Sequence, residues 1–251
     1  MNASERKIEI LKLLKKGPLE VDALSRTFNV STMTVRRDLR KFDEQGLVYV
    51  SNGKAFLCES VSSEESYVLK KDKMISEKIH IAKKANEFIN DNDVIYLDCG
   101  TTCNMVAEEL AKTKKNVIVF TNSILVANTL FSVSSVELYM LPGKFRDKTM
   151  GFIGNFTIEF MRRFYFDKCF MGTEGIDLEH GISTPYMEDG NTKQCAIEKS
   201  KRIFIVTDHT KFGLKTSYSY VGVSDADYII TNDSDVDTTP YEDKGVTIIK
   251  V

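Results

Sequence analysis

The pattern of hydrophobic positions predicts three short helices followed by a β-hairpin at the start of the chain. In the third helix, Val35, Leu39 and Phe42 recur at i, i+4 and i+7, so they form one apolar stripe that faces a core. Ser31 precedes this helix and can cap it, and Asn52-Gly53 between two apolar runs is typical of a tight hairpin turn. The helices are expected over residues 5–16, 21–28 and 31–45, and the hairpin strands over residues 47–50 and 55–57.

The polar face of the third helix is basic. A short helix with one buried face and a basic, hydroxyl-bearing outer face suits the DNA major groove, where its first turn reaches base edges and its arginines reach phosphates. A solvated basic helix fits the same pattern equally well, but only two residues separate this helix from the preceding one. That tight connection, with the hairpin, predicts a winged helix-turn-helix domain over residues 1–57. The residues that lie mostly off the apolar stripe are Thr34, Arg36, Arg37, Arg40 and Lys41.

Beyond residue 57 the hydrophobic pattern changes twice. Residues 58–75 are polar and rich in serine and glutamate, without a clear apolar period, and predict a linker. From residue 76 onward, apolar strands alternate with amphipathic helices, which predicts a doubly wound, mostly parallel α/β domain over residues 76–251. Helices are expected over residues 77–89, 104–112, 124–130 and 191–200, and strands over residues 94–97, 117–120, 136–141, 167–171, 202–206, 228–231 and 246–249.

Polar residues cluster where these strands are expected to end. Ligands of open α/β sheets bind at the carboxyl ends of strands, near helix N-termini. Gly100-Thr101-Thr102 joins a strand to a helix and offers backbone amides and two hydroxyls to an anion, Thr121-Asn122 closes the next strand, and Asp208 with Lys211 follows a third. Each of these pieces alone also fits an ordinary turn or a surface loop. Together, with Asp98 suited to sugar hydroxyls, they predict a pocket for a phosphorylated, hydroxyl-rich small molecule.

Composition and charge narrow the class of protein. The chain has 251 residues, of which 42% are hydrophobic and 28% charged, as in an ordinary globular protein. It contains no apolar run long enough to span a membrane and no signal-peptide core near its start. Five scattered cysteines indicate reduced thiols and a cytoplasmic protein. Residues 1–57 carry 11 basic and 7 acidic residues, whereas the remainder carries 23 and 29, so a polyanion is expected to bind at the N-terminal domain.

The N-terminal motif resembles the signature of the DeoR family of bacterial transcription regulators. The matching residues are Val30-Ser31-x-Met33-Thr34-Val35-Arg36-Arg37-Asp38-Leu39 and Gln45-Gly46-Leu47. In that family the helix that begins at the serine is the DNA-recognition helix. The family usually carries Gly-Gly-Ala in the wing, where this chain reads Gly53-Lys54-Ala55. The resemblance places Ser31, Thr34, Arg36 and Arg37 against operator DNA, and Arg40 is added by its place on the basic face. Lys54 at the tip of the wing can contact phosphate, but a solvated turn residue fits equally well. Asp38 is expected to pair with an arginine inside the domain.

Four C-terminal motifs resemble the sensor domain of the same family, in family order. They are Asp98-x-Gly100-Thr101-Thr102, Thr121-Asn122, Asp167-x-x-Phe170-x-Gly172-x-x-Gly175-Ile176 and Asp208-x-x-Lys211-Phe212-Gly213. The resemblance implies a fold like that of ribose-5-phosphate isomerase and an effector that is a phosphorylated sugar or a related metabolite. Pro142-Gly143 stands where the family has Gly-Gly, and it is followed by Lys144 and Arg146, which can add phosphate ligands or lie in a solvated loop. The residues expected to bind the effector are Asp98, Gly100, Thr101, Thr102, Thr121, Asn122, Lys144, Asp208 and Lys211.

The predicted function is therefore a DNA-binding repressor of a sugar-metabolism operon, controlled by a phosphorylated sugar and not itself an enzyme. A homodimer or homotetramer is expected, because paired half-sites compensate for weak binding by one module. The alternative is a sugar-phosphate isomerase with an appended DNA-binding domain, in which Asp98 or Glu174 would act as the base. No cofactor or metal is expected, because Cys99-x-x-x-Cys103 lacks a second pair of ligands.

Overall fold

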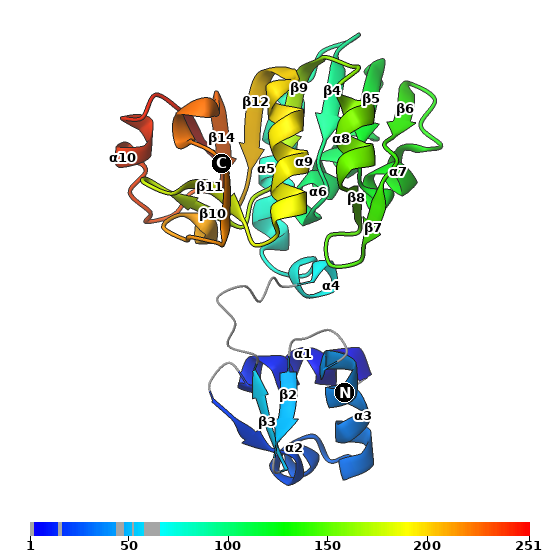
Figure 1. Cartoon of the computed structure of the whole chain (residues 1–251), viewed down its shortest axis with the longest axis vertical. Coiled ribbons are helices and arrows are strands. Elements are labelled where there is room, and N and C mark those ends of the chain that lie inside the picture. Colours follow the sequence, from blue (N-terminus) through cyan, green and yellow to red (C-terminus); the bar gives the residue numbers. More distant parts are fainter. Residues whose placement is uncertain (1–2, 15–16, 44–47, 52, 58–65) are drawn as a thin grey trace. The chain divides into compact units, whose positions relative to one another are not determined.

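The computed structural model describes residues 3–14, 17–43, 48–51, 53–57 and 66–251, and in it the chain divides into two units, residues 1–63 and 64–251 (Figure 1). The predicted helix end at Gly46, the turn residue Asn52 and the first part of the predicted linker lie outside the described residues. Within the described ranges, no helix has both the length and the apolar character needed to cross a bilayer.

Within its described residues, the first unit has three helices and a three-stranded antiparallel sheet in the order β1-β3-β2, which confirms the predicted winged helix-turn-helix elements. The two-residue strand β1 was not predicted, because only its pairing with β3, Leu19 opposite Ala55, makes it a strand. The elements are α1 (Ala3–Leu14), β1 (Leu19–Glu20), α2 (Val21–Phe28), α3 (Thr32–Asp43), β2 (Val48–Ser51) and β3 (Lys54–Leu57).

The helix caps and the apolar stripe predicted from the sequence define the helix-turn-helix in the structure. Asn29 ends α2 in the left-handed conformation, with φ 50°. The Ser31 hydroxyl oxygen accepts a hydrogen bond from the backbone N–H of Thr34 at 3.2 Å and so caps α3. The stripe formed by Val35, Leu39 and Phe42 is buried, as predicted.

Asp38 lies on the buried side of α3 and pairs with an arginine of the first helix. The guanidinium of Arg6 contacts the Asp38 carboxylate at 2.8 Å through two nitrogens, and both side chains are buried. Charged groups are buried in pairs because an isolated buried charge is costly. The prediction of an internal arginine partner for Asp38 is confirmed.

The second unit is built on a seven-stranded, wholly parallel sheet in the order β15-β14-β12-β9-β4-β5-β6. Each strand forms where the sequence predicts one, within two residues at either end, because buried parallel strands are near-continuous apolar runs. The strands are β4 (Val94–Leu97), β5 (Val117–Thr121), β6 (Val136–Met140), β9 (Phe166–Met171), β12 (Ser200–Val206), β14 (Tyr228–Thr231) and β15 (Thr247–Lys250).

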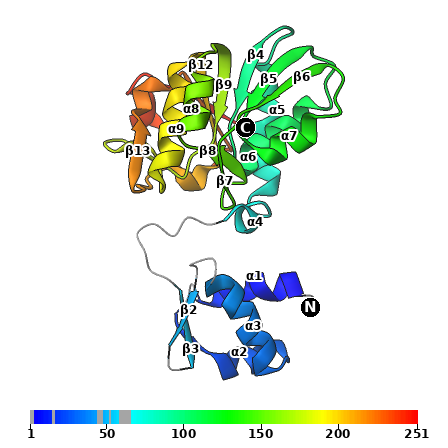
Figure 2. The same cartoon turned by 45° about the vertical axis from the view of Figure 1, so that its right-hand side comes forward.

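Helices cover both faces of this sheet and bury two apolar cores. One core packs against α5 (Ile75–Glu87), α6 (Thr101–Leu110) and α7 (Ile124–Leu130), and the other against α8 (Asn155–Met161) and α9 (Met187–Glu198). Figure 2 shows the two groups of helices on opposite sides of the strands. The predicted doubly wound α/β class is confirmed.

Several smaller elements were not predicted. They include α4 (Tyr67–Lys70), which forms inside the segment predicted as a linker, and α8. The remaining elements are a hairpin of β7 (Lys144–Arg146) with β8 (Gly151–Ile153), a small antiparallel sheet of β10 (Gly175–Asp177), β11 (Gly181–Thr184) and β13 (Tyr218–Val221), the 3-10 turns η1 (His209–Lys211) and η2 (Val223–Asp225), and α10 (Thr239–Glu242).

The topology creates a switch point between β4 and β9. These strands are neighbours, but the chain continues from β4 to β5 on one side and from β9 to β12 on the other. Loops that leave adjacent strands in opposite directions open a crevice at the carboxyl ends of those strands.

Candidate functional site

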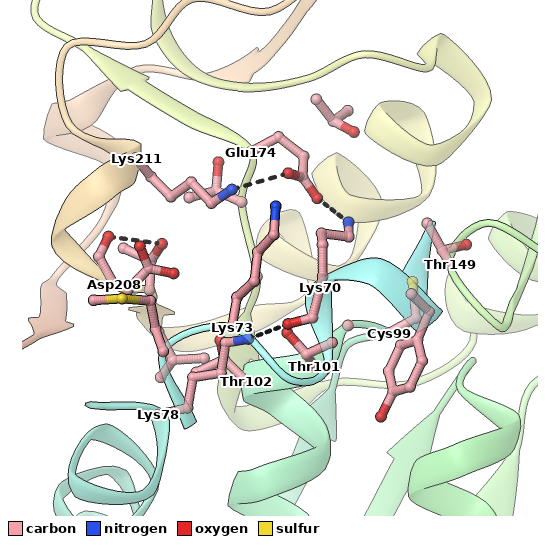
Figure 3. Close-up of a pocket in the computed structure, with 18 of the residues that line it drawn as sticks. Lys70, Lys73, Lys78, Cys99, Thr101, Thr102, Thr149, Glu174, Asp208 and Lys211 are labelled. Atoms are coloured by element: carbon pink, nitrogen blue, oxygen red, sulfur yellow. Dashed lines mark hydrogen bonds and ion pairs between the residues drawn. The ribbon is translucent and has the colours of Figure 1, made fainter. Parts of the chain in front are cut away.

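A cavity of about 430 Å³ lies at this switch point (Figure 3). Its lining comes from the loops after β4, β9 and β12 and from the segment between α4 and α5, so residues far apart in sequence meet here. The charged and hydroxyl-bearing residues that line it are Lys70, Lys73, Lys78, Thr101, Thr102, Lys148, Thr149, Thr173, Glu174, Thr184, Asp189, Lys193, Thr207, Asp208, Thr210 and Lys211, with Tyr67.

The first turn of α6 provides part of the cavity wall. Gly100 precedes this helix with φ 135°, a conformation that favours glycine, and its carbonyl accepts the N–H of Asn104 at 3.0 Å. Thr101 and Thr102 form the first turn, and both are largely buried. The N–H groups of a helix start have no partners within the helix, and the helix dipole is positive there, so this wall favours an anion.

Positive charge dominates the cavity. Six lysines line it, against the carboxylates of Glu174, Asp189 and Asp208 in the lining and that of Asp98 directly beneath it. The described residues therefore leave an excess of two positive charges, which matches the charge of one phosphate monoester.

Glu174 joins two of these lysines. Its carboxylate pairs with the Lys70 amine on one side and contacts the Lys211 amine at 3.3 Å on the other, as Figure 3 shows. Burial alone would raise the pKa of Glu174, but the charges of Lys70 and Lys211 outweigh burial and lower the pKa to about 2. Glu174 is therefore ionised at any physiological pH.

Lys78 extends from α5 into the same cavity. Its amine donates a hydrogen bond to the carbonyl oxygen of Lys70 at 2.7 Å. Burial lowers the pKa of Lys78 to about 8; the Asp208 carboxylate opposes this shift, and the charges of Lys211, Lys70 and Lys73 add to it. An anion placed among these lysines would raise the pKa of Lys78 and so favour its charged form.

A buried charge network supports the floor of the cavity. Lys193 on α9 pairs with Asp98, contacts the Asp189 carboxylate at 3.8 Å and donates to the carbonyl of Gly172 at 3.2 Å. Asp98 also accepts the N–H of Gly172 at 3.1 Å, which ties the end of β4 to the loop after β9. Although burial opposes it, the two carboxylates raise the pKa of Lys193 well above its usual value, so this ammonium stays charged.

The cavity contains some of the residues predicted to bind an effector and not others. Gly100, Thr101, Thr102, Asp208 and Lys211 line it. Asp98 lies fully buried under its floor.

Three predicted residues lie elsewhere. The Thr121 hydroxyl donates to the carbonyl of Leu97 at 2.7 Å, and the Asn122 amide donates to the carbonyl of Phe152 at 3.0 Å, so both buried side chains satisfy backbone groups near the carboxyl end of β5. Lys144 is exposed on β7 and pairs with Glu188 at 3.2 Å.

Sequence reasoning missed most of the cavity lysines. Lys70, Lys73 and Lys78 lie in or next to the segment predicted as a linker, where the dense run of lysines was the available signal. Lys193 and Asp189 lie four residues apart on α9, a spacing that favours ion pairs. Nothing in the sequence pattern places Lys148 at the cavity.

The first unit presents the predicted basic face on α3. Ser31, Arg36, Arg37 and Arg40 are exposed. Thr34 is half-buried, and its hydroxyl oxygen lies 2.9 Å from that of Ser31. The side chain of Met33 in the first turn is 74% exposed, which sequence reasoning did not single out. Lys54 is exposed at the start of β3, and its amine lies 3.8 Å from the Glu20 carboxylate.

Among the described residues, no group of three or more His, Cys, Asp or Glu side chains is arranged to hold a metal ion. Cys99 and Cys103 are both buried, and burial raises the pKa of each thiol.

Both units of the chain match domains of known proteins. Residues 6–61 match the DeoR-like helix-turn-helix domain, and residues 73–233 match the DeoR C terminal sensor domain. The chain is 31% identical to the uncharacterized HTH-type transcriptional regulator FruR of Bacillus subtilis (strain 168), over 94% of this chain and 93% of the relative. It is also 31% identical to the glycerol-3-phosphate regulon repressor of Escherichia coli (strain K12), over 92% of each chain. Among solved structures, ribose 5-phosphate isomerase from Plasmodium falciparum matches 55% of this chain and 53% of its own, with a TM-score of 0.41 and 21% identity.

Proposed function

Because the chain belongs to the DeoR family of transcriptional regulators, we propose that it represses a sugar-metabolism operon and that a phosphorylated sugar controls its affinity for operator DNA. The glycerol-3-phosphate regulon repressor, which it resembles along almost its whole length, is named for a regulon of this kind. The charge of the cavity supports the proposal most directly, because six lysines and a helix N-terminus converge on one space.

The phosphate of the effector is expected to bind at the first turn of α6. Backbone amides and the hydroxyls of Thr101 and Thr102 supply donors there, and the lysines supply charge. The carboxylate of Asp208 is a candidate acceptor for sugar hydroxyls, as is the hydroxyl of Thr210. A cavity of about 430 Å³ is within the range of small-molecule sites.

Operator DNA is expected to bind the exposed face of α3. Ser31 and Thr34 begin the helix, where a recognition helix meets base edges, and Arg36, Arg37 and Arg40 follow as phosphate or base contacts. Lys54 would contact phosphate only after exchanging its ion pair with Glu20 for the DNA backbone. We propose that a homodimer or homotetramer presents two such helices to paired half-sites in the cytoplasm.

An isomerase reaction finds no support in the cavity. Isomerisation needs a carboxylate that accepts a proton near neutral pH. Glu174 has a pKa of about 2 and faces two ammonium groups, which makes it a very weak base. Asp98 is fully buried beneath the floor and pairs with Lys193. The relatives compared above are named as transcriptional regulators.

A ligand screen tests the proposal. The full chain would be screened by thermal shift against a panel of sugar phosphates and the same sugars without phosphate. At about 100 times its dissociation constant, a true effector should stabilise the fold by about 2.7 kcal/mol. The same compound should change the mobility shift of DNA from upstream of the chain's own gene.

Thr101→Val locates the binding site, because it removes one hydroxyl of α6 and keeps the side-chain shape. The variant should bind DNA normally and respond less to the effector. Thr239→Val, in the distant element α10, is the matched control. A panel without a single response, or a Thr101→Val variant with a normal response, would contradict the assignment.

A further inference from the structure

The cavity already contains an anion of its own. Glu174 follows β9, its side chain is only about one-fifth exposed, and its carboxylate oxygens contact two different lysines. Figure 3 shows Lys211 reaching it from one side of the cavity and Lys70 from the other. Both amines are donors that a phosphate in this cavity would use, so the carboxylate and the ligand have the same partners.

One of these partners lies near the start of the second unit. Lys70 ends α4, the first helix after residues 58–65. The N–H of Tyr67 at the start of α4 donates to the carbonyl of Lys148 at 2.8 Å, and the Lys70 carbonyl accepts from Lys78 at 2.7 Å. Any exchange of partners at the Lys70 amine therefore takes place on a cavity wall that is continuous in sequence with the DNA-binding unit.

We propose that Glu174 is an internal competitor for the effector's anionic group and that it determines specificity for a dianion. This inference rests on the proposed function and deepens it. Without effector, Glu174 occupies the amines of Lys70 and Lys211; with effector, phosphate oxygens take over these contacts.

The charges of the competing groups determine which ligands can replace Glu174 at the lysines. A carboxylate carries one negative charge, whereas a phosphate monoester carries nearly two at neutral pH together with three strong acceptor oxygens. A phosphate thus displaces Glu174 from its lysines. A sugar acid with one carboxylate carries the same charge as Glu174 and therefore has no electrostatic advantage over it. A neutral sugar does not compete with Glu174 for the two lysine amines.

The test compares the full chain with its Glu174→Gln variant, using inorganic phosphate as the dianion and acetate as the monoanion at constant ionic strength. Glutamine keeps the size of the side chain and removes its charge. Isothermal titration should show phosphate binding the variant about tenfold more tightly than the wild type, which corresponds to about 1.4 kcal/mol. Acetate should bind the variant measurably and the wild type far more weakly.

A matched variant separates competition from a general change of charge. Glu179→Gln removes one charge from an exposed turn five residues after Glu174 in the sequence. It should change phosphate affinity by less than about threefold, because this carboxylate is not part of the cavity lining and long-range effects are screened by salt.

A further variant keeps the test decisive if Glu174→Gln folds poorly. Glu174→Asp retains the charge but shortens the side chain by one methylene, so its carboxylate is not expected to reach both amines; phosphate should bind it more tightly than the wild type. Melting curves of all variants identify loss of fold.

The outcomes distinguish this inference from the proposed function. If the wild type binds neither phosphate nor any sugar phosphate, the proposed function fails and this inference fails with it. If the wild type binds them but the Glu174 variants gain no affinity, or gain no more than Glu179→Gln, only the competition is overturned.

Discussion

The protonation states of single side chains in this protein depend on the charges around them, and Lys78 is the clearest case. It lies almost fully buried in the cavity wall, with one carboxylate and three other lysines acting on it. Its pKa of about 8 lies close to physiological pH, so a modest change in its surroundings changes its charge.

We expect the affinity for a sugar phosphate to fall as the pH rises from about 7 to about 9. The Lys78 amine is charged below its pKa of about 8 and neutral above it, whereas the ligand's phosphate, with a second pKa of about 6, keeps its charge over this range. Anion binding favours the charged amine, so affinity is greatest below the pKa and decreases above it. Titration calorimetry at several pH values measures the slope.

Lys78→Arg is the diagnostic variant for this pH effect. Arginine remains charged throughout the range, so the variant should bind with a nearly flat profile. Lys83→Arg, on the exposed face of the same helix, should retain the wild-type slope. A slope that persists in Lys78→Arg would assign the titration to a different group.

The buried pair of Arg6 and Asp38 makes a second residue-scale prediction. Asp38→Asn leaves the Arg6 guanidinium buried without a charged partner, which should lower the free energy of unfolding of the first unit by about 3 kcal/mol. Urea denaturation followed by circular dichroism measures the change. Asp43→Asn, at the exposed end of the same helix, should change stability by less than about 0.5 kcal/mol. An equal loss in both variants would show that the pair does not stabilise the unit.

At the scale of elements, α3 combines a buried stripe with a basic exposed face. Val35, Leu39 and Phe42 anchor the helix in the first unit, so the arginines on its other side are held on a rigid support. Their arrangement follows from the helical period alone, which is why the sequence was sufficient to predict it.

Arg37→Ala should weaken DNA binding and reduce the slope of log affinity against log salt by about one. A phosphate contact releases about one counterion, so its loss appears in the slope and affects all DNA sequences similarly. Mobility shifts at several salt concentrations measure both effects. Lys12→Ala removes an exposed charge from α1 and should leave the slope unchanged. A wild-type slope in Arg37→Ala would exclude a phosphate contact by this residue.

The strands and helices also show which structural features can be predicted from the sequence and which cannot. Strands such as β4 and β14 form at the predicted residues because a continuous apolar run identifies a buried parallel strand. By contrast, β11 pairs with β13, with Ile182 opposite Val221 and Thr184 opposite Tyr218, so this pairing joins segments far apart in the sequence and depends on contacts that no local pattern records. Thr121 was assigned to the site by its place after a strand, yet its hydroxyl bonds to the neighbouring strand instead. Lys70 was overlooked because α4 follows a polar stretch without periodicity.

At the scale of the whole molecule, the proposal requires that the two binding events influence one another. Coupling between an effector and DNA is reciprocal, because both affinities belong to one thermodynamic cycle. Helix α3, where operator DNA is proposed to bind, lies in the first unit, and the cavity lies in the second.

We expect the effector to change operator affinity by a factor between about 5 and about 150, the usual range for such coupling. The operator should change effector affinity by the same factor. Fluorescence anisotropy of labelled DNA with and without effector gives one factor, and calorimetric titration of effector with and without unlabelled DNA gives the other. Two unequal factors would reveal an additional linked equilibrium, such as assembly, and two factors of one would contradict control by the effector.

The burial of four cysteines in the second unit has a practical consequence for such measurements. Cys99, Cys103, Cys169 and Cys195 are buried as free thiols, and burial raises the pKa of each, that of Cys169 to about 12. Alkylating reagents and peroxides attack thiolates, which these residues do not supply while the second unit is folded. Their rate of labelling therefore reports how often this unit opens, and a bound ligand that slows the reaction can be detected without any knowledge of the operator.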